Sequence, residues 1–286
     1  ANNNVAVGYH SLEENTTGTQ NTALGSSALD EATTASNNTA VGYASLTTAT
    51  TGHSNASHGS FSLANSTTGS ENSAIGHNSG ADITTGNSNT CIGYRTGEYG
   101  TLLQTGNGNV LLGAYTRTST TNSSYANGIG YDINATAGYT TIGSSGSDIR
   151  AQNGVATWST VSDERVKKDI TDAEAGLSFI NDLRPRTFKY KAKGDLPKEF
   201  HSYEKGSTET YKNEFTNHGF IAQEVKEAVD NHPELKDGFK MWDVREDTGQ
   251  QEVGEAAVIP VLVKAVQELS TQVDELKAEI QTLKGE

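Results

Sequence analysis

A glycine that recurs every 17 residues is the feature that most constrains how this chain can fold. It occurs at Gly8, Gly25, Gly42, Gly59, Gly76 and Gly93, and an asparagine stands four residues before each of these glycines. A Thr-Thr pair, usually followed by Gly, closes most units. The period stretches to 20 residues at Gly113, and the degenerate copies "ANGIGY" and "YTTIGS" follow. Self-similarity at a short, fixed period is the signature of a repeat architecture in which each unit stacks on the next.

The three residues before each repeat glycine predict a short strand. "VAV", "TAL", "TAV", "SAI" and "TCI" carry larger apolar groups on one face and small groups on the other. The glycine lets the backbone turn, and the Thr-Thr-Gly segments supply the next corner. One unit buries too little to stand alone, so we expect stacked coils, a β-solenoid. The small-residue face indicates that another backbone comes close, from a second coil or from a symmetry-related chain.

These repeats resemble the head repeats of trimeric bacterial autotransporter adhesins, whose shorter units also end in an Asn…Ala-Ile-Gly-type strand. The resemblance covers about residues 3–143. It implies that three chains wind the solenoid together.

Composition divides the chain near residue 160. Residues 1–160 hold three arginines, no lysine and no proline against nine acidic residues, whereas residues 161–286 hold 18 basic and 26 acidic residues. Both parts are net negative, so a nucleic-acid partner is not expected. There is no apolar run of 18 residues and no signal-peptide pattern, so we predict no membrane insertion. The chain opens on Ala1 and is expected to be a piece of a longer protein.

The second part predicts mixed α and β structure. "TDAE" at 171–174 has the form of a capping box before a helix that carries Leu177, Ile180 and Leu183. "RTFKYK" and "KMWDV" are typical of strands, and "HGFIAQEVKEAVD" predicts a short strand that leads into a helix.

The C-terminus carries a coiled-coil pattern over four heptads. Its apolar residues alternate spacings of three and four: Ile259, Leu262, Val266, Leu269, Val273, Leu276, Ile280 and Leu283. Glu279 and Lys284 occupy g and e positions that can pair between chains. β-Branched residues at a with Leu at d favour a dimer in an isolated peptide. We expect a homotrimer, because a folded domain upstream can override a preference set by four heptads.

"STVSDERVKKDI" at 159–170 places Ser162 and Lys167 at the change of composition. They are candidates for a Ser–Lys pair, in which the lysine acts as general base once its pKa falls toward neutrality through desolvation or nearby positive charge. Arg165 and Lys168 are near in sequence. Most Ser-x4-Lys spacings are solvated loop residues, so spacing alone does not identify a peptidase.

"SDERVKKDI", "HGFIAQEV" and "VIPVLVKAVQEL", in that order, resemble the C-terminal intramolecular chaperone of endosialidases, phage tail spikes and neck appendages. This domain is classed as a self-cleaving serine peptidase. The resemblance covers about residues 159–286 and implies one autocatalytic cut after the trimer has folded. It makes Ser162 the nucleophile and Lys167 the base, with Ser162–Asp163 as the first choice of scissile bond and the bond before Ser162 as the alternative. Further residues match the family's motifs: Arg165, His218, Gln223 and Glu224.

The predicted fold class is therefore a mainly β N-terminal half, a trimeric β-solenoid of 17-residue repeats, followed by an α+β chaperone domain that ends in a coiled-coil helix. The expected segments are the repeat solenoid (1–117), degenerate repeats and a connector (118–160), the chaperone domain (161–255) and the coiled-coil helix (256–286).

Binding is the predicted task of the polar half, because its nine acids are too irregularly placed for the paired carboxylates of a glycosidase. The stretch 98–140 interrupts the period and is the preferred receptor-contact region. Its tyrosines are the candidates: Tyr99, Tyr115, Tyr125 and Tyr131. His58 occupies an otherwise apolar slot where three copies could meet and bind a metal or an anion, but a packed histidine is favoured, and we predict neither a metal nor a cofactor.

The expected function is the distal part of a homotrimeric host-recognition fibre of a virion. Its partners would be two further copies and a host surface receptor, with a glycan as one candidate. The alternative is a bacterial surface adhesin built from the same parts, with a non-cleaving chaperone. Enzyme activity would be a single-turnover cut of the chain itself.

Overall fold

The computed structural model describes residues 2–235 and 238–285. Its backbone contacts divide the chain into two compact units, Ala1–Lys167 and Lys168–Glu286. The four segments expected from the sequence stay a prediction; the structure's own division falls just after the Ser162–Lys167 stretch.

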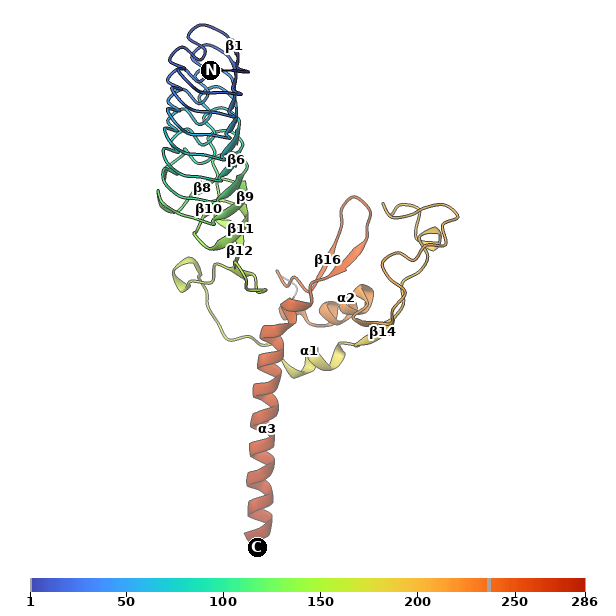
Figure 1. The fold of residues 1–286 in the computed structure, drawn as a ribbon. Coiled ribbons are helices and arrows are strands. Elements are labelled where there is room, and N and C mark those ends of the chain that lie inside the picture. Colours follow the sequence, from blue (N-terminus) through green and yellow to red (C-terminus); the bar gives the residue numbers. More distant parts are fainter. Residues whose placement is uncertain (1, 236–237, 286) are drawn as a thin grey trace. The chain divides into compact units, whose positions relative to one another are not determined.

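The first unit is a parallel β-solenoid, as predicted from the 17-residue repeat (Figure 1). One strand of each coil joins a single 11-stranded sheet, and paired residues lie one repeat apart, as in Ala6 with Ala23 and Ala23 with Ala40. The strands that continue the repeat are β1 (Val5–Val7), β2 (Thr22–Leu24), β3 (Thr39–Val41), β4 (Ala56–His58), β5 (Ser73–Ile75), β6 (Thr90–Ile92), β7 (Val110–Leu112), β9 (Asn127–Tyr131) and β11 (Tyr139–Ser144).

Two features of this unit were not expected from the repeat. A two-stranded parallel sheet, β8 (Arg117–Thr118) and β10 (Asn134–Ala135), lies where the period lengthens. The solenoid sheet then ends in two antiparallel strands, β12 (Ser147–Gln152) and β13 (Ser159–Thr160).

The small-residue face of the strands forms the core of the solenoid. The middle residue of successive strands is fully buried: Ala23, Ala40, Ser57, Ala74, Cys91 and Leu111. The close backbone belongs to the same chain, since Ser45 Oγ donates to the carbonyl oxygen of Ser57 and Ser79 Oγ to that of Cys91. Burial raises the pKa of the Cys91 thiol to about 12, which keeps it protonated.

The larger apolar groups lie on the other side of the strands, at the molecular surface. We call them the outer strand face: Val7, Leu24, Val41, His58, Ile75, Ile92, Leu112, Ile129 and Ile142. Val7 is 56% exposed, Leu24 47% and Ile75 49%. A long exposed row that is apolar at every position except His58 is unusual on a single soluble chain.

The repeat glycines are required by close approach of successive coils. Gly25 has a φ of 143°, and a Cβ built on it would lie 2.3 Å from the carbonyl oxygen of Gly42. Gly42 has a φ of 136°, and a Cβ built on it would lie 2.6 Å from the carbonyl oxygen of Gly59. Both the left-handed backbone and the missing side chain therefore explain why glycine recurs.

The repeat asparagines form a hydrogen-bonded ladder through the solenoid. In Asn55, Nδ2 donates to Gly69 O at 2.9 Å and to Asn38 Oδ1 at 3.1 Å, while Oδ1 accepts from the Asn72 N–H at 2.9 Å. The same contacts recur one coil away at Asn72, where Nδ2 donates to Gly86 O and Oδ1 accepts from the Asn89 N–H. Each amide thus satisfies buried backbone groups at a corner that has no regular sheet pairing.

We expect Asn55→Ala to destabilise the solenoid strongly. The change leaves two buried backbone groups, Gly69 O and the Asn72 N–H, without their partners, at about 1–3 kcal/mol each. Thermal unfolding followed by the β-sheet circular dichroism signal measures the effect. Asn122→Ala, at an exposed position, is the control and should unfold like the wild type. Equal unfolding temperatures for both variants would refute the role of the ladder.

Over its described residues, the second unit contains three α-helices and two short pairs of antiparallel strands. Its elements are α1 (Leu177–Asp182), β14 (Arg186–Phe188), β15 (Asn217–Gly219), α2 (Ala222–Asn231), β16 (Trp242–Val244), β17 (Gln251–Val253) and α3 (Ile259–Gly285). β14 pairs with β15 and β16 with β17, both antiparallel. Short 3-10 turns cover η2 (Lys193–Asp195), η3 (Pro233–Leu235) and η4 (Glu255–Val258). Phe179, Val225, Met241 and Val261 form the core.

The predicted capping box at 171–174 is wrong. α1 begins only at Leu177, with Gly176 at the cap position and no side-chain cap from its own segment. The Glu268 carboxylate of α3 accepts the Leu177 N–H instead, at 2.8 Å. The free amide at the helix start is therefore satisfied from 91 residues away, which no local pattern announces.

The predicted coiled-coil residues lie along α3, and all eight are exposed in the single chain. We call this row the helix seam: Ile259, Leu262, Val266, Leu269, Val273, Leu276, Ile280 and Leu283. None of the helices that the structure describes is both long and apolar enough to cross a lipid bilayer.

Candidate active site at the end of the solenoid unit

Ser162 and Lys167 are brought together by one tight turn. A 3-10 turn, η1 (Glu164–Val166), reverses the chain directly after Ser162. Its first free amide is capped by Asp163, whose carboxylate accepts the Arg165 N–H at 2.9 Å. The turn returns Lys167 to the serine, and Lys167 Nζ donates to Ser162 Oγ at 2.7 Å. The spacing of five residues thus produces a direct serine–lysine contact.

Asp163 and Arg165 stabilise that turn. The Arg165 guanidinium donates to both carboxylate oxygens of Asp163, at 2.9 and 2.6 Å. This hydrogen bonding, together with the Arg165 N–H, lowers the pKa of the Asp163 carboxyl. Asp163 therefore stays ionised in its bidentate pair and has no proton to supply at neutral pH. Its place in the structure is that of a positioning residue for the turn.

The serine–lysine pair is solvent-exposed in a single chain. Ser162 and Lys167 are both exposed, and so are the apolar neighbours Val161, at 64%, and Val166, at 69%. A solvated ammonium holds its proton, and a lysine becomes a base only when burial or a nearby cation disfavours the charged form. The pair has the contact that nucleophilic catalysis needs. The exclusion of water that would make Lys167 a base would have to come from contact with another protein surface.

Glu224, Gln223 and His218 belong to the second compact unit. Glu224 stands in the first turn of α2 and accepts two hydrogen bonds from Arg186, at 2.9 and 2.6 Å, which lower the pKa of its carboxyl. Gln223 lines a hollow of about 740 Å³ together with Phe188 and Tyr190. His218 is exposed in β15, opposite Thr187.

Sequence reasoning missed Arg186, the partner of Glu224. The available signal was the Arg184-x-Arg186 pair ahead of a helix whose first turn carries a carboxylate. Arg184 also approaches this helix, with its guanidinium 3.7 Å from Glu227. The family-motif glutamate is therefore engaged in an ion pair that links α2 to strand β14.

Three of the four predicted receptor tyrosines gather on the solenoid. Tyr99, Tyr115 and Tyr131 line a hollow of about 240 Å³ with Arg95 and Asp132. The ring centroids of Tyr99 and Tyr115 are 4.8 Å apart, and those of Tyr115 and Tyr131 are 5.8 Å apart. Tyr125 is 67% exposed and lies outside this hollow.

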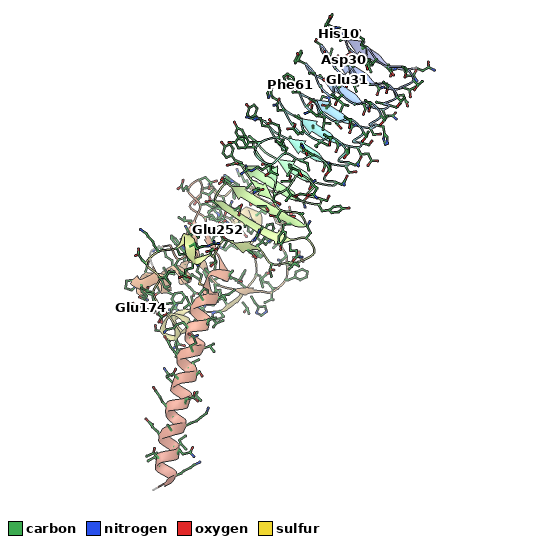
Figure 2. All side chains as sticks on the ribbon, turned by 90° about the vertical axis from the view of Figure 1, so that its left-hand side faces the viewer. His10, Asp30, Glu31, Phe61, Glu174 and Glu252 are labelled. Atoms are coloured by element: carbon green, nitrogen blue, oxygen red, sulfur yellow. The ribbon has the colours of Figure 1, made fainter. Side chains whose placement is uncertain are left out.

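These tyrosines continue a longer line of rings, which was not predicted from the sequence as one continuous row. We call it the aromatic row: Tyr43, Phe61, His77, Tyr94, Tyr115 and Tyr131. Neighbouring centroids are 5.2 to 6.1 Å apart. Every member stands one or two residues after a repeat glycine, which was the signal available in the sequence. Figure 2 shows Phe61 projecting from the edge of the solenoid.

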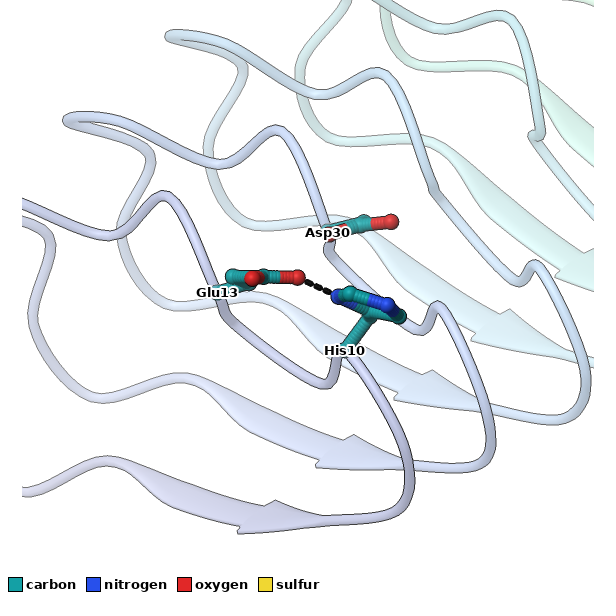
Figure 3. A group of neighbouring side chains, drawn as sticks. All are labelled: His10, Glu13 and Asp30. Carbon is teal, nitrogen blue, oxygen red and sulfur yellow. Dashed lines mark ion pairs between the residues drawn. The ribbon is translucent and has the colours of Figure 1, made fainter.

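His10, Glu13 and Asp30 form a group that could hold a metal ion (Figure 3). One ligand atom from each lies within 4.8 Å of the others, and His10 Nδ1 contacts a Glu13 carboxylate oxygen. Glu13 and Asp30 are equivalent positions of successive repeats, which is how the coil stacks two carboxylates. The residues are exposed or half-buried, a setting in which such groups are also common without an ion.

His58, the histidine considered from the sequence, lies elsewhere. It belongs to the outer strand face, between Val41 and Ile75, and is exposed. A site made by three copies of His58 stays a hypothesis.

Comparison with known proteins finds one family model that matches part of this chain. Residues 162–233 match the model of a peptidase family described as the chaperone of endosialidase. The match begins at Ser162 and includes Lys167, His218, Gln223 and Glu224. Searches of curated proteins and of solved structures gave no match.

Proposed function

Starting from residues 162–233 as a C-terminal intramolecular chaperone domain of the endosialidase type, we propose that this chain is the distal part of a homotrimeric host-recognition fibre. Its chaperone assembles the trimer and then releases itself by a cut next to Ser162. The observation that carries the proposal is the 2.7 Å contact between Lys167 Nζ and Ser162 Oγ, at the first residue of the family match.

Two apolar surfaces support assembly with further copies. The outer strand face lies in the solenoid unit and the helix seam in the chaperone unit, and both leave large aliphatic side chains in water. Both run along repeating elements, so identical chains aligned in parallel would bring like positions together. Burial of such rows is a main source of association free energy, at about 25 cal/mol per Å² of apolar surface. Three copies would cover both rows and give the fibre its register.

The proposed cut is an acyl transfer to Ser162 Oγ. Neutral Lys167 takes the hydroxyl proton as Oγ attacks a carbonyl carbon, and the carbon–nitrogen bond then breaks as Lys167 returns the proton to the leaving nitrogen. Water hydrolyses the ester that results and regenerates the serine hydroxyl. One bond of the chain is cut, and no metal or cofactor takes part in these steps.

The two candidate bonds differ in the ring that Ser162 Oγ would form during attack, and therefore in whether the attacking serine can belong to the same chain. We take Ser162–Asp163 as the scissile bond. Attack by Ser162 Oγ on its own carbonyl would close a four-membered ring, so this cut requires the serine of another chain. The alternative, cutting Val161–Ser162, closes a five-membered ring within one chain.

Trimer assembly would switch the pair on. Val161 and Val166 flank the pair and are exposed in one chain. If copies cover these valines, the same contact removes water from around Lys167 and disfavours a charged side chain there. Cleavage would then occur only after assembly, and an unassembled chain would stay intact.

Release of the chaperone gives the fibre kinetic protection. Parallel pairing across many coils is slow and prone to misregister. The chaperone unit would hold three chains in register while the solenoid forms, which speeds correct pairing. Once it is removed, unfolded chains could no longer reassemble in the same way. The remaining solenoid then persists because its barrier to unfolding is high. We place this fibre in a virion tail or appendage, the setting of the chaperones that the sequence resembles.

A chain that stops after Ser162 tests the chaperone role. We expect it to give little or no soluble trimer, whereas the full chain expressed in the same way gives trimeric solenoid. Size-exclusion chromatography with light scattering measures the difference. If the shortened chain forms the same trimers in the same yield, residues 163–286 are not needed for assembly and the proposal is wrong.

A further inference from the structure

We propose that the hollow beside Phe61 and His77 binds an uncharged sugar residue of the host receptor. The inference rests on the proposed function and assigns the ligand class to one place on the solenoid. The hollow has a volume of about 350 Å³, and the residues that the argument uses are Phe61, Asn65, His77, Asn78, Asp82 and Glu98. All belong to the solenoid unit.

Aromatic faces supply the apolar part of the site. Phe61 is 40% exposed, and its centroid lies 6.1 Å from that of His77. His77 stacks on Tyr94 at 5.6 Å and an interplanar angle of 22°. Rings held by their neighbours offer flat, preorganised surfaces that lose little side-chain entropy on binding. A pyranose presents a face of C–H groups that packs on such a surface.

Hydrogen-bonding groups supply the polar part. Asn65 Nδ2 donates to Asp82 Oδ1 at 3.1 Å, which leaves the other Asp82 oxygen as an acceptor. Asn78 Oδ1 is buried and has no hydrogen-bond partner among the described residues. A buried carbonyl oxygen without a donor is costly and rare, and it indicates a group that an incoming hydroxyl or amide can satisfy. Small-molecule sites usually combine an apolar wall with a few polar groups.

Charge decides which sugars fit. Asp82 and Glu98 both line the hollow. Burial raises the pKa of the Asp82 carboxyl, the bond from Asn65 opposes this, and the nearby Glu98 carboxylate raises it further. The Asp82 carboxylate would repel a carboxylate, sulfate or phosphate on a ligand, whereas the charge of Glu98 is balanced by Arg95. Neutral hydroxyl-rich sugars donate to these oxygens, so we exclude sialylated and sulfated glycans as ligands of this hollow.

The site extends along the aromatic row toward the second hollow. Glu98 lines the first hollow and Arg95 the second, and the two side chains are joined by hydrogen bonds of 2.6 and 3.0 Å. Tyr99 lies under both Arg95 and Arg117, with guanidinium carbons 5.3 and 5.8 Å from its ring centroid. An oligosaccharide that follows the row would place successive residues on either side of the Arg95–Glu98 pair.

A printed array of neutral and sialylated or sulfated oligosaccharides tests the inference on the full chain. The wild type should bind neutral oligosaccharides. It should not bind oligosaccharides that carry only sialylated or sulfated residues. Phe61→Ala should lower the signal on those neutral probes by about tenfold or more. Asp82→Asn should also weaken binding to them. Tyr9→Ala removes a tyrosine that is 74% exposed and lies outside the aromatic row, and it should bind like the wild type.

Other outcomes overturn the inference. Binding only to anionic probes, no binding to any neutral probe, or full binding by Phe61→Ala would each do so. Native mass and cleavage of Phe61→Ala are measured in parallel; a change in assembly mass would identify the row as a contact between copies instead. If the wild-type chain assembles and cleaves itself but does not bind neutral sugars, this inference is wrong and the proposed function still stands. If it neither assembles nor cuts, the proposed function fails.

Discussion

Replacing Ser162 with alanine is expected to leave the chain at its full 30.3 kDa, whereas the wild type separates into two fragments at that position. The variant removes the one hydroxyl that Lys167 Nζ contacts, and no acyl transfer can begin without it. Denaturing mass spectrometry of freshly purified protein measures both. A wild-type fragment that ends at Ser162 identifies the bond to Asp163, and one that ends at Val161 identifies the alternative.

Lys167→Met should also abolish the cut, because it keeps the length of the side chain and removes the base. Lys168→Met is the matched control: it removes a neighbouring lysine for which the structure shows no bond to Ser162 among the described residues, and it should cut normally. Both variants should assemble like Ser162→Ala. If Ser162→Ala is cut as the wild type is, a contaminating protease is responsible. If all chains stay whole, the peptidase proposal fails for this protein.

Leu276→Glu in the helix seam should abolish trimers and, with them, the cut. Leu276 is 56% exposed in the single chain and would lie at a d position of the coiled coil. Burying one Leu contributes about 1.5–3 kcal/mol, and the change places one carboxylate from each copy on the axis in its stead. Sedimentation velocity gives the assembly state, and mass spectrometry of the same sample gives the extent of cleavage.

Ala278→Glu is the matched control for this change. It introduces the same side chain two residues further along α3, at an exposed position that is not part of the helix seam. Assembly and cleavage should match the wild type. Trimers formed by Leu276→Glu would show that the helix seam does not hold the copies together. Loss of trimers with normal cleavage would show that the serine–lysine pair is active without assembly.

The solenoid could be predicted from sequence because each coil repeats one local solution. A glycine with positive φ, a three-residue strand and an asparagine recur at fixed spacing, so the stacking register follows from the period alone. Which face of the strand turns inward did not follow from that pattern. The small groups at Ala23 and Ala40 are buried against the chain's own backbone, and the larger ones remain outside.

The candidate site was predictable in part. The spacing of Ser162 and Lys167 spans one 3-10 turn, so their contact is local and could be read from sequence. Contacts made by tertiary packing were not accessible in the same way. Glu268 caps α1 from the far end of the unit, and Arg186 binds Glu224 across 38 residues. The aromatic row uses two positions of the repeat, one or two residues after the glycine, so its members align only once the coils are stacked.

Native mass spectrometry of the wild type beside Ser162→Ala tests the central claim most directly. The account predicts three intact chains for the variant, with a mass three times 30.3 kDa, and three copies of the solenoid fragment for the mature wild type. This pair of results would show that the chaperone unit assembles the fibre and is then removed from it. Single-chain masses for both proteins, or cut chains that never formed a trimer, would contradict the account.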